Sequence, residues 1–229
     1  MTMIHELRIY QVAAGRMADM DAMMSHQCTP VFQRHRLPRP LGAWSASAGP
    51  RLPAYVWILG WPSLEARNAG WAAFGGDAQW QQIRRSAHEH GELTVRIDTQ
   101  FMMAWPDATP ADGAEPAPPG TSCDLWLMRV HTGLAAAARK TFLAVDRPLL
   151  ESLGARLEAA FDLVSGEELP VVACLLRWPD AARRADILAR YETHPEVRAA
   201  RAAEHAEQGC DVFVACDRYA MNAASPFGR

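Results

Sequence analysis

The stretch ELRIYQVAAG, residues 6–15, occurs a second time in diverged form as DLWLMRVHTG, residues 124–133. The offset of 118 residues also relates Pro30 to Pro148, and a single-residue deletion changes it to 117 further along the chain. This period is far longer than the roughly 20–50 residues of solenoid repeats. The sequence therefore predicts a tandem duplication of one small domain.

A proline-rich stretch separates the two copies. Residues 106–120 contain five prolines and two glycines but no large apolar side chain. Such a composition cannot nucleate a core, and proline favours an extended spacer. We therefore expect one domain at residues 1–105, a linker at residues 106–120, and a second, divergent domain at residues 121–229.

Composition and charge narrow the classes of partner. The chain carries 23 basic and 26 acidic residues, a net charge of −3, which gives no electrostatic basis for nucleic-acid binding. We expect no signal peptide and no membrane span, because no apolar run reaches about 18 residues. Five cysteines without a Cys-x-x-Cys motif favour reduced thiols in a cytoplasmic protein. We expect neither a metal site nor a cofactor, and no glycine-rich phosphate loop or nucleophile elbow is present.

Each copy reads as strand, helix, strand, strand, helix, strand. In the first copy we expect strands at 4–12, 41–48, 55–61 and 95–104, and helical regions at 16–35 and from Leu64 onward. In the second copy the strands are 124–130, 155–164, 171–178 and 211–221, and the helical regions are 134–153 and 181–208. Pro30 predicts a kink or break in the first helix, and Gly75-Gly76 predicts a break in the second.

This order predicts an α+β fold made of two ferredoxin-like βαββαβ units, each a four-stranded antiparallel sheet with both helices on one face. The other face of each sheet is left bare and needs a partner. Two such sheets commonly pack face to face and form a barrel. The two copies could cover each other within one chain, or each could pair with another chain.

Polar side chains share one face of the first strand. Residues of a strand alternate between its faces, so Leu7 and Ile9 point one way and Glu6, Arg8 and Tyr10 the other. If desolvated, these three must pair or bind something. In the functional interpretation Arg8 binds an anion and is held by Glu6, while Tyr10 donates a hydrogen bond or acts as general acid. In the structural interpretation Glu6 and Arg8 form an interdomain salt bridge.

The second copy lacks this polar set, because Asp124, Trp126 and Met128 stand at the corresponding positions. We therefore expect the pocket to belong to the first domain and the second domain to act as scaffold. Trp126 and Met128 could cap the cavity of the first domain.

Four further residues are candidates for the site. Trp44 and Trp57 are expected as pocket walls, because aromatic side chains bury large areas and offer flat binding surfaces. His26 and His35 have no histidine counterpart in the second copy. An imidazole is the usual proton carrier near neutral pH and could also ligate haem iron.

Several segments resemble NIPSNAP-family domains. IHELRIY (residues 4–10), LGAW (41–44), and SLEAR (63–67) leading to DAQW (77–80) fall in the order of that family and cover nearly all of residues 3–105. The second copy keeps the spacing but loses most of the signature. The resemblance implies the fold of the dimeric α+β barrel superfamily, which includes cofactor-free monooxygenases, small isomerases and lyases, and haem-binding enzymes. The family has no single established reaction, so fold transfers better than function.

The leading hypothesis is a cytoplasmic protein that binds a small, partly apolar, anionic organic molecule. As an enzyme it would carry out cofactor-independent isomerisation, elimination or oxygenation, with Tyr10 or a helix histidine as proton carrier. Two alternatives remain. One is a non-catalytic interaction protein, with copies associating through the sheet faces, and the other is a haem-binding oxygenase.

Overall fold

The computed structural model describes residues 3–89, 91–108 and 117–224. The first half contains β1 (Ile4–Val12), α1 (Met17–Ala22), the π-helical turn η1 (Met23–Gln27), α2 (Cys28–Arg34), β2 (Gly42–Ala48), β3 (Ala54–Trp61), α3 (Leu64–Gly76), α4 (Ala78–His88) and β4 (Thr94–Ala104). After the short helix η2 (Pro106–Ala108), the second half contains β5 (Ser122–Val130), α5 (Ala135–Thr141), η3 (Phe142–Asp146), α6 (Arg147–Leu153), β6 (Arg156–Leu163), β7 (Val171–Arg177), α7 (Ala181–Thr193), α8 (Pro195–Gln208) and β8 (Phe213–Ala223).

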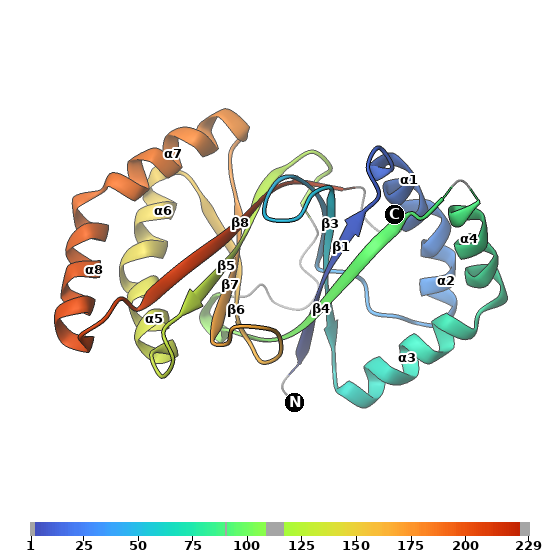
Figure 1. Cartoon of the computed structure of the whole chain (residues 1–229), viewed down its shortest axis with the longest axis horizontal. Coiled ribbons are helices and arrows are strands. Elements are labelled where there is room, and N and C mark those ends of the chain that lie inside the picture. Colours follow the sequence, from blue (N-terminus) through green and yellow to red (C-terminus); the bar gives the residue numbers. More distant parts are fainter. Residues whose placement is uncertain (1–2, 90, 109–116, 225–229) are drawn as a thin grey trace.

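The eight strands of the described residues form one closed barrel in the order β1-β3-β2-β8-β5-β7-β6-β4. The halves join at two seams, where β2 pairs with β8 and β4 pairs with β6, both antiparallel. Figure 1 shows α1–α4 on one side of the barrel and α5–α8 on the other. The bare sheet face of each half is therefore covered by the other half of the same chain.

Apolar side chains form three cores. One fills the barrel and combines Leu7 and Ile9 of β1 with Leu125 and Phe161 of the second half. The other two lie between the barrel wall and each helical layer. Because strand residues alternate in direction, each strand supplies one set of side chains to the barrel interior and the other set to its own helices. Within the described residues both faces of each half-sheet are occupied, and the association of copies through sheet faces stays an untested expectation.

The predicted break in the second helical region is confirmed. The side chain of Ser63 accepts a hydrogen bond from the backbone N of Ala66 at 3.1 Å and caps α3. α3 ends at Gly76, and the Asp77 side chain caps α4 by accepting from the backbone N of Gln79 at 2.8 Å. A short polar side chain supplies the acceptor that the first helical N–H groups lack.

The helix is interrupted, as expected, but not at Pro30 itself. The irregularity lies earlier, in the π-helical turn η1, and α2 begins two residues before Pro30. The missing N–H of Pro30 therefore falls in the first turn of a helix, where it is tolerated. The second half repeats this arrangement, with η3 preceding α6 and Pro148 at the start of α6.

The two halves are connected by a segment of which residues 109–116 lie outside the described residues. Directly before these residues, Ala108 of η2 is buried in the helix-side core of the second half. Directly after them, Ala117 packs against the barrel core. The domain limits 1–105 and 121–229 stay a prediction. Within the described residues no helix is long and apolar enough to cross a membrane.

Candidate functional site

A cavity of about 300 Å³ lies between the sheet of the first half and its helices. Its walls are mainly aromatic and sulfur-containing side chains, namely Phe32, Trp57, Trp71, Phe74, Trp80, Met23, Met24 and Cys28. Arg8 and Tyr10 of β1 add polar groups, and Arg84 and His88 of α4 line the cavity with exposed side chains. A mostly apolar pocket with a few converging polar groups is the usual form of a small-molecule site.

The guanidinium group of Arg8 is held in one orientation. β1 places Arg8 directly opposite Trp57 of β3, and the guanidinium carbon lies 4.8 Å from the ring centroid of Trp71 and 5.6 Å from that of Trp57. Nη1 donates to Glu6 Oε1 at 2.6 Å and Nε donates to the Tyr10 hydroxyl at 3.1 Å. Nη2 has no acceptor in the part of the chain that the structure describes, so it is available to a ligand.

The carboxylate of Glu6 is the fully buried anchor behind this group. Besides Arg8, it accepts from Trp61 Nε1 at 2.8 Å, from Trp71 Nε1 at 3.0 Å, and from Arg67 Nη2 at 2.8 Å. Burial alone would raise the pKa of Glu6, but the hydrogen bonds from Arg67 and Trp71 and the charge of Arg8 outweigh it and lower the pKa. Glu6 is therefore ionised at neutral pH and positions Arg8 without lining the cavity itself.

The charges of this cluster favour an anion. One carboxylate, Glu6, faces two guanidinium groups, Arg8 and Arg67. The cluster therefore keeps one positive charge in excess next to a cavity with apolar walls. A charge in such surroundings is stabilised when it is paired. A carboxylate, phenolate or enolate oxygen beside Arg8 Nη2 would supply the missing partner, with a charge-assisted hydrogen bond.

Tyr10 and Cys28 are uncharged members of the lining. Burial raises the pKa of Tyr10, although the charge of Arg8 opposes this. The Tyr10 oxygen accepts from Arg8, so its own proton remains free to be donated. Burial raises the pKa of the Cys28 thiol to about 12, which leaves it protonated and a poor nucleophile at neutral pH.

The second half repeats the anchor but not the free donor. Asp124 accepts hydrogen bonds from Trp178 Nε1 at 3.0 Å and from Arg184 Nε at 2.6 Å. Trp178 and Arg184 occupy the positions that Trp61 and Arg67 occupy in the first half. At the position of Arg8, Trp126 Nε1 donates to Asp124 at 3.0 Å. The anchor is thus common to both copies. The Glu6–Arg8 ion pair lies within β1, so the expectation of an interdomain bridge is wrong.

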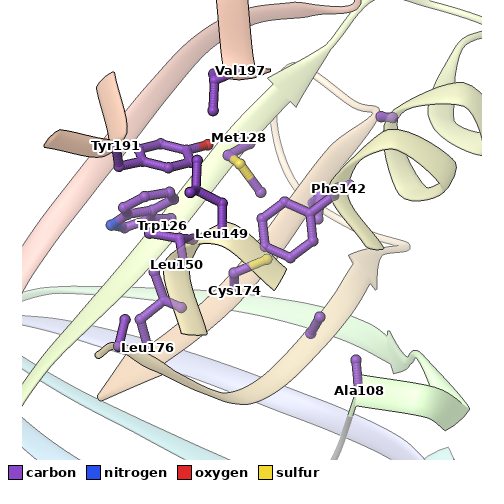
Figure 2. Packing of buried hydrophobic residues seen from close by; sticks show 14 of the residues in the cluster. Ala108, Trp126, Met128, Phe142, Leu149, Leu150, Cys174, Leu176, Tyr191 and Val197 are labelled. Carbon is purple, nitrogen blue, oxygen red and sulfur yellow. The ribbon is translucent and has the colours of Figure 1, made fainter. Parts of the chain in front are cut away.

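The second half fills the corresponding space with side chains. Figure 2 shows Trp126 and Met128 packed with Phe142 and Tyr191 in the helix-side core of this half. At the position of Cys28, the buried Asp146 accepts from the Tyr191 hydroxyl at 2.6 Å and is paired with Arg201. The expectation that Trp126 and Met128 cap the first cavity is wrong, because they face the helices of their own half.

Trp44 does not line the cavity. On β2 its neighbour Ala43 belongs to the helix-side core, so Trp44 points into the barrel interior. Trp57 on β3 has the opposite direction and is a wall of the cavity. The sequence identified both residues as aromatic strand positions, but it did not establish which face of each strand meets the helices.

His26 and His35 also lie away from the cavity. The side chain of His26 is exposed in η1, and His35 Nε2 lies 2.8 Å from the Asp77 carboxylate at the start of α4. The hydrogen bond with His35, together with the capped backbone N–H groups, lowers the pKa of Asp77. Neither histidine is placed to reach the cavity, so the residues expected to ligate haem iron do not fit that role.

The sequence missed most of the helical contribution to the site. Phe32, Trp71, Phe74 and Trp80 were recognisable as apolar positions in helices, but nothing in their spacing marks a cavity wall rather than a packed core. The sequence contained one signal for a role of Arg67, since the repeat preserves an arginine at the corresponding position, Arg184. The described residues contain no group of three or more His, Cys, Asp or Glu side chains that could hold a metal ion.

The fold and the cavity place the protein in the class of α+β barrel proteins. Two solved structures share the fold along nearly the whole chain. A candidate monooxygenase from Lactobacillus acidophilus NCFM is 8% identical, with 99% of this chain and 96% of that chain covered and a TM-score of 0.58. An anthrone oxidase-like protein is 13% identical, with 100% and 95% covered and a TM-score of 0.56.

Residues 5–108 match the family model described as NIPSNAP, and the first half of the chain is therefore a NIPSNAP domain. A NIPSNAP-like domain protein from Burkholderia xenovorans is 25% identical, with 52% of this chain and 93% of that chain covered and a TM-score of 0.40. No curated protein matches the sequence.

Proposed function

We propose that the first half binds a small, flat, partly apolar organic anion in the cavity between its sheet and helices. The observation that carries this proposal is the pair of unused donors, Arg8 Nη2 and the Tyr10 hydroxyl proton, which lie within aromatic walls beside an excess positive charge. The aromatic rings would hold the flat body of the ligand, and Arg8 would hold its anionic oxygen.

If the protein is an enzyme, the same groups support cofactor-independent acid/base chemistry. The imidazole of His88 lines the cavity and can accept a proton from a substrate carbon or hydroxyl. Arg8 and Tyr10 would stabilise the oxyanion that this proton loss creates. The resulting enolate could be reprotonated elsewhere, expel a leaving group, or be oxidised by O₂, so isomerase, lyase and oxygenase activities share this first step.

The structural neighbours support the oxidative branch, since three that cover nearly the whole chain are described as candidate monooxygenases or as an anthrone oxidase-like protein. The order of elements supports the description of each half as a ferredoxin-like unit. All five cysteines are free, which agrees with a reducing, cytoplasmic compartment. An association between copies through the sheet faces stays a proposal.

Titration calorimetry with 2-naphthoate and with uncharged 2-naphthalenemethanol tests the proposal. The two probes share one ring system, so the difference reports the anionic group. We expect 2-naphthoate to bind at least about tenfold more tightly, the difference of one charge-assisted hydrogen bond. The variant Ala87→Phe, which extends a side chain into the cavity, should abolish binding, whereas Ala73→Phe on the exposed face of α3 should not. Equal affinities for the two probes would contradict the proposal.

The histidines of the first helix provide a further prediction. His26→Ala and His35→Ala should both bind 2-naphthoate as the wild type does, because neither side chain lines the cavity. His35→Ala should lower the melting temperature, since it removes a partner of the Asp77 cap, whereas His26→Ala should leave it unchanged. If either variant stays folded but no longer binds 2-naphthoate, the replaced histidine contributes to the site and the prediction is wrong.

A further inference from the structure

A second cavity, of about 330 Å³, opens at the end of the barrel where the β2–β3 and β6–β7 hairpins meet. Its floor is apolar and buried, formed by Ile9 of β1, Leu163 of β6 and Val171 of β7, all members of the barrel core. Both halves contribute, so this cavity exists because the barrel closes within one chain. It is distinct from the first cavity, since Arg8 and Tyr10 occupy the other face of β1.

Tyr219 of β8 contributes a buried polar group to this cavity. The side chain is only 4% exposed and lines the cavity. Its ring lies so close to Gly49 that a Cβ there would meet Tyr219 Cδ1 at 2.5 Å, and Gly49 also has a φ of +152°. The ring is therefore fixed beneath the β2–β3 hairpin. Within the described residues, its hydroxyl has no hydrogen-bond partner.

The guanidinium groups around the cavity are each paired with a carboxylate through one of their nitrogens. Arg51 Nη1 donates to Asp98 Oδ2 at 2.5 Å, and Arg96 Nε donates to Asp98 Oδ1 at 2.7 Å. Arg129 pairs with Glu168 across the mouth. These pairs tie both hairpins to the neighbouring strands, but Asp98 is shared by Arg51 and Arg96, and the buried Nε of Arg129 has no hydrogen-bond partner among the described residues.

Two carboxylates of the lining remain. Glu167 and Asp217 have no ion-pair partner within 4.0 Å among the residues that the structure describes, and both line the cavity. Taken together, the lining has three guanidinium groups and four carboxylates, so it carries one net negative charge. Burial raises the pKa of the Tyr219 hydroxyl, while the charge of Arg51 lowers it and the charges of Asp217 and Asp98 raise it. Glu167 and Asp217 are therefore acceptors of hydrogen bonds above an apolar floor, and the net charge of the lining favours a cation.

We propose that this mouth cavity binds a small organic cation, an alkylammonium compound with a short hydrocarbon chain. The ammonium group would lie between the carboxylate of Asp217 and the oxygen of Tyr219, both of which can accept its N–H bonds. The hydrocarbon chain would cover Ile9, Leu163 and Val171 and remove apolar surface from water. The reaction or ligand of the first cavity does not enter this inference.

The test compares 1,5-diaminopentane with glutarate, two five-carbon chains of opposite charge, by titration calorimetry on the full chain. The diamine should bind, more weakly as NaCl is raised, and glutarate should not. Asp217→Asn should weaken diamine binding about tenfold, the loss of one charge-assisted hydrogen bond, and Tyr219→Phe should weaken it several-fold. Asp186→Asn, an exposed carboxylate on α7, serves as the matched control, and Arg8→Ala should have no effect.

Three results would overturn the inference. They are the absence of diamine binding at millimolar concentration, equal binding of glutarate, and equal diamine affinities of Asp217→Asn and Asp186→Asn. Melting curves of both variants identify any loss of folding. Tyr219→Phe keeps the ring that packs on Gly49, so a binding defect in that folded variant reports the hydroxyl alone. The binding of 2-naphthoate is measured on the same variants. A loss of diamine binding at the mouth cavity can therefore be distinguished from a loss of ligand binding in the first cavity.

Discussion

Replacing Arg8 with alanine should weaken the binding of 2-naphthoate about 30-fold or more, the effect of about 2 kcal/mol. The substitution removes the free Nη2 donor and the excess positive charge of the cavity in one step. The protein should stay folded, because Glu6 keeps its bonds from Arg67, Trp61 and Trp71. Titration calorimetry measures the affinity, and a melting curve of the same sample establishes the folded state.

Two comparisons make this result specific. Arg8→Lys retains the charge but cannot bond Glu6, Tyr10 and a ligand together in one planar arrangement, so its affinity should be intermediate. Arg85→Ala removes an exposed guanidinium from α4 that does not line the cavity, and should bind as the wild type does. Unfolding of Arg8→Ala would instead indicate that Arg8 serves the structure through its ion pair with Glu6. Unchanged affinity in a folded variant would remove Arg8 from the site.

Replacing Glu6 with alanine should have the largest effect on stability, about 3–5 kcal/mol, because it leaves buried positive charge without its partner. Arg8, Arg67 and two indole N–H groups would all lose their acceptor. Asp124→Ala should cause a similar loss, since the second half has the same anchor. Chemical denaturation measures both, and we expect a single transition, because the two halves share the barrel core.

The pH dependence of stability checks the same prediction. The pKa of Glu6 lies below its ordinary value of 4.5 in the folded protein. Its stabilising contribution is therefore complete above that value and is lost as the pH falls toward the folded pKa. Glu6→Gln should flatten the decline in stability below pH 4.5 relative to the wild type. The role of Glu6 as an anchor would be contradicted if Glu6→Gln lost stability at low pH as the wild type does. It would also be contradicted if Glu6→Ala lowered the free energy of unfolding by less than about 1 kcal/mol.

The repeat made most of the fold predictable. Strand alternation, the Ser63 and Asp77 caps and the break at Gly75-Gly76 are local features, set by side-chain direction and by the hydrogen-bonding needs of the backbone. The π-helical turn before Pro30 was not predictable, because its hydrogen-bond register depends on how the helix packs on the sheet. Barrel closure within one chain was one of two arrangements that the sequence allowed.

The candidate site was only partly predictable. Alternation placed Glu6, Arg8 and Tyr10 on one face of β1, and they do lie together. The same alternation could not identify Trp44 as a barrel-core residue and Trp57 as a cavity wall, because it relates residues within a strand and not one strand to another. The role of Glu6 was misjudged as specific to the first copy, since its partners Trp61 and Arg67 are distant in sequence.

The sequence by itself therefore determined the duplication, the elements and the polar face of the first strand, because these depend on near neighbours and on period. The tertiary structure decided which face of each sheet meets helices and which meets the other half. That choice depends on the burial of apolar surface across the closed barrel, to which residues more than 100 positions apart contribute. It leaves Arg8 with a free donor in an open cavity, while Trp126, at the same position of the second copy, completes a packed core.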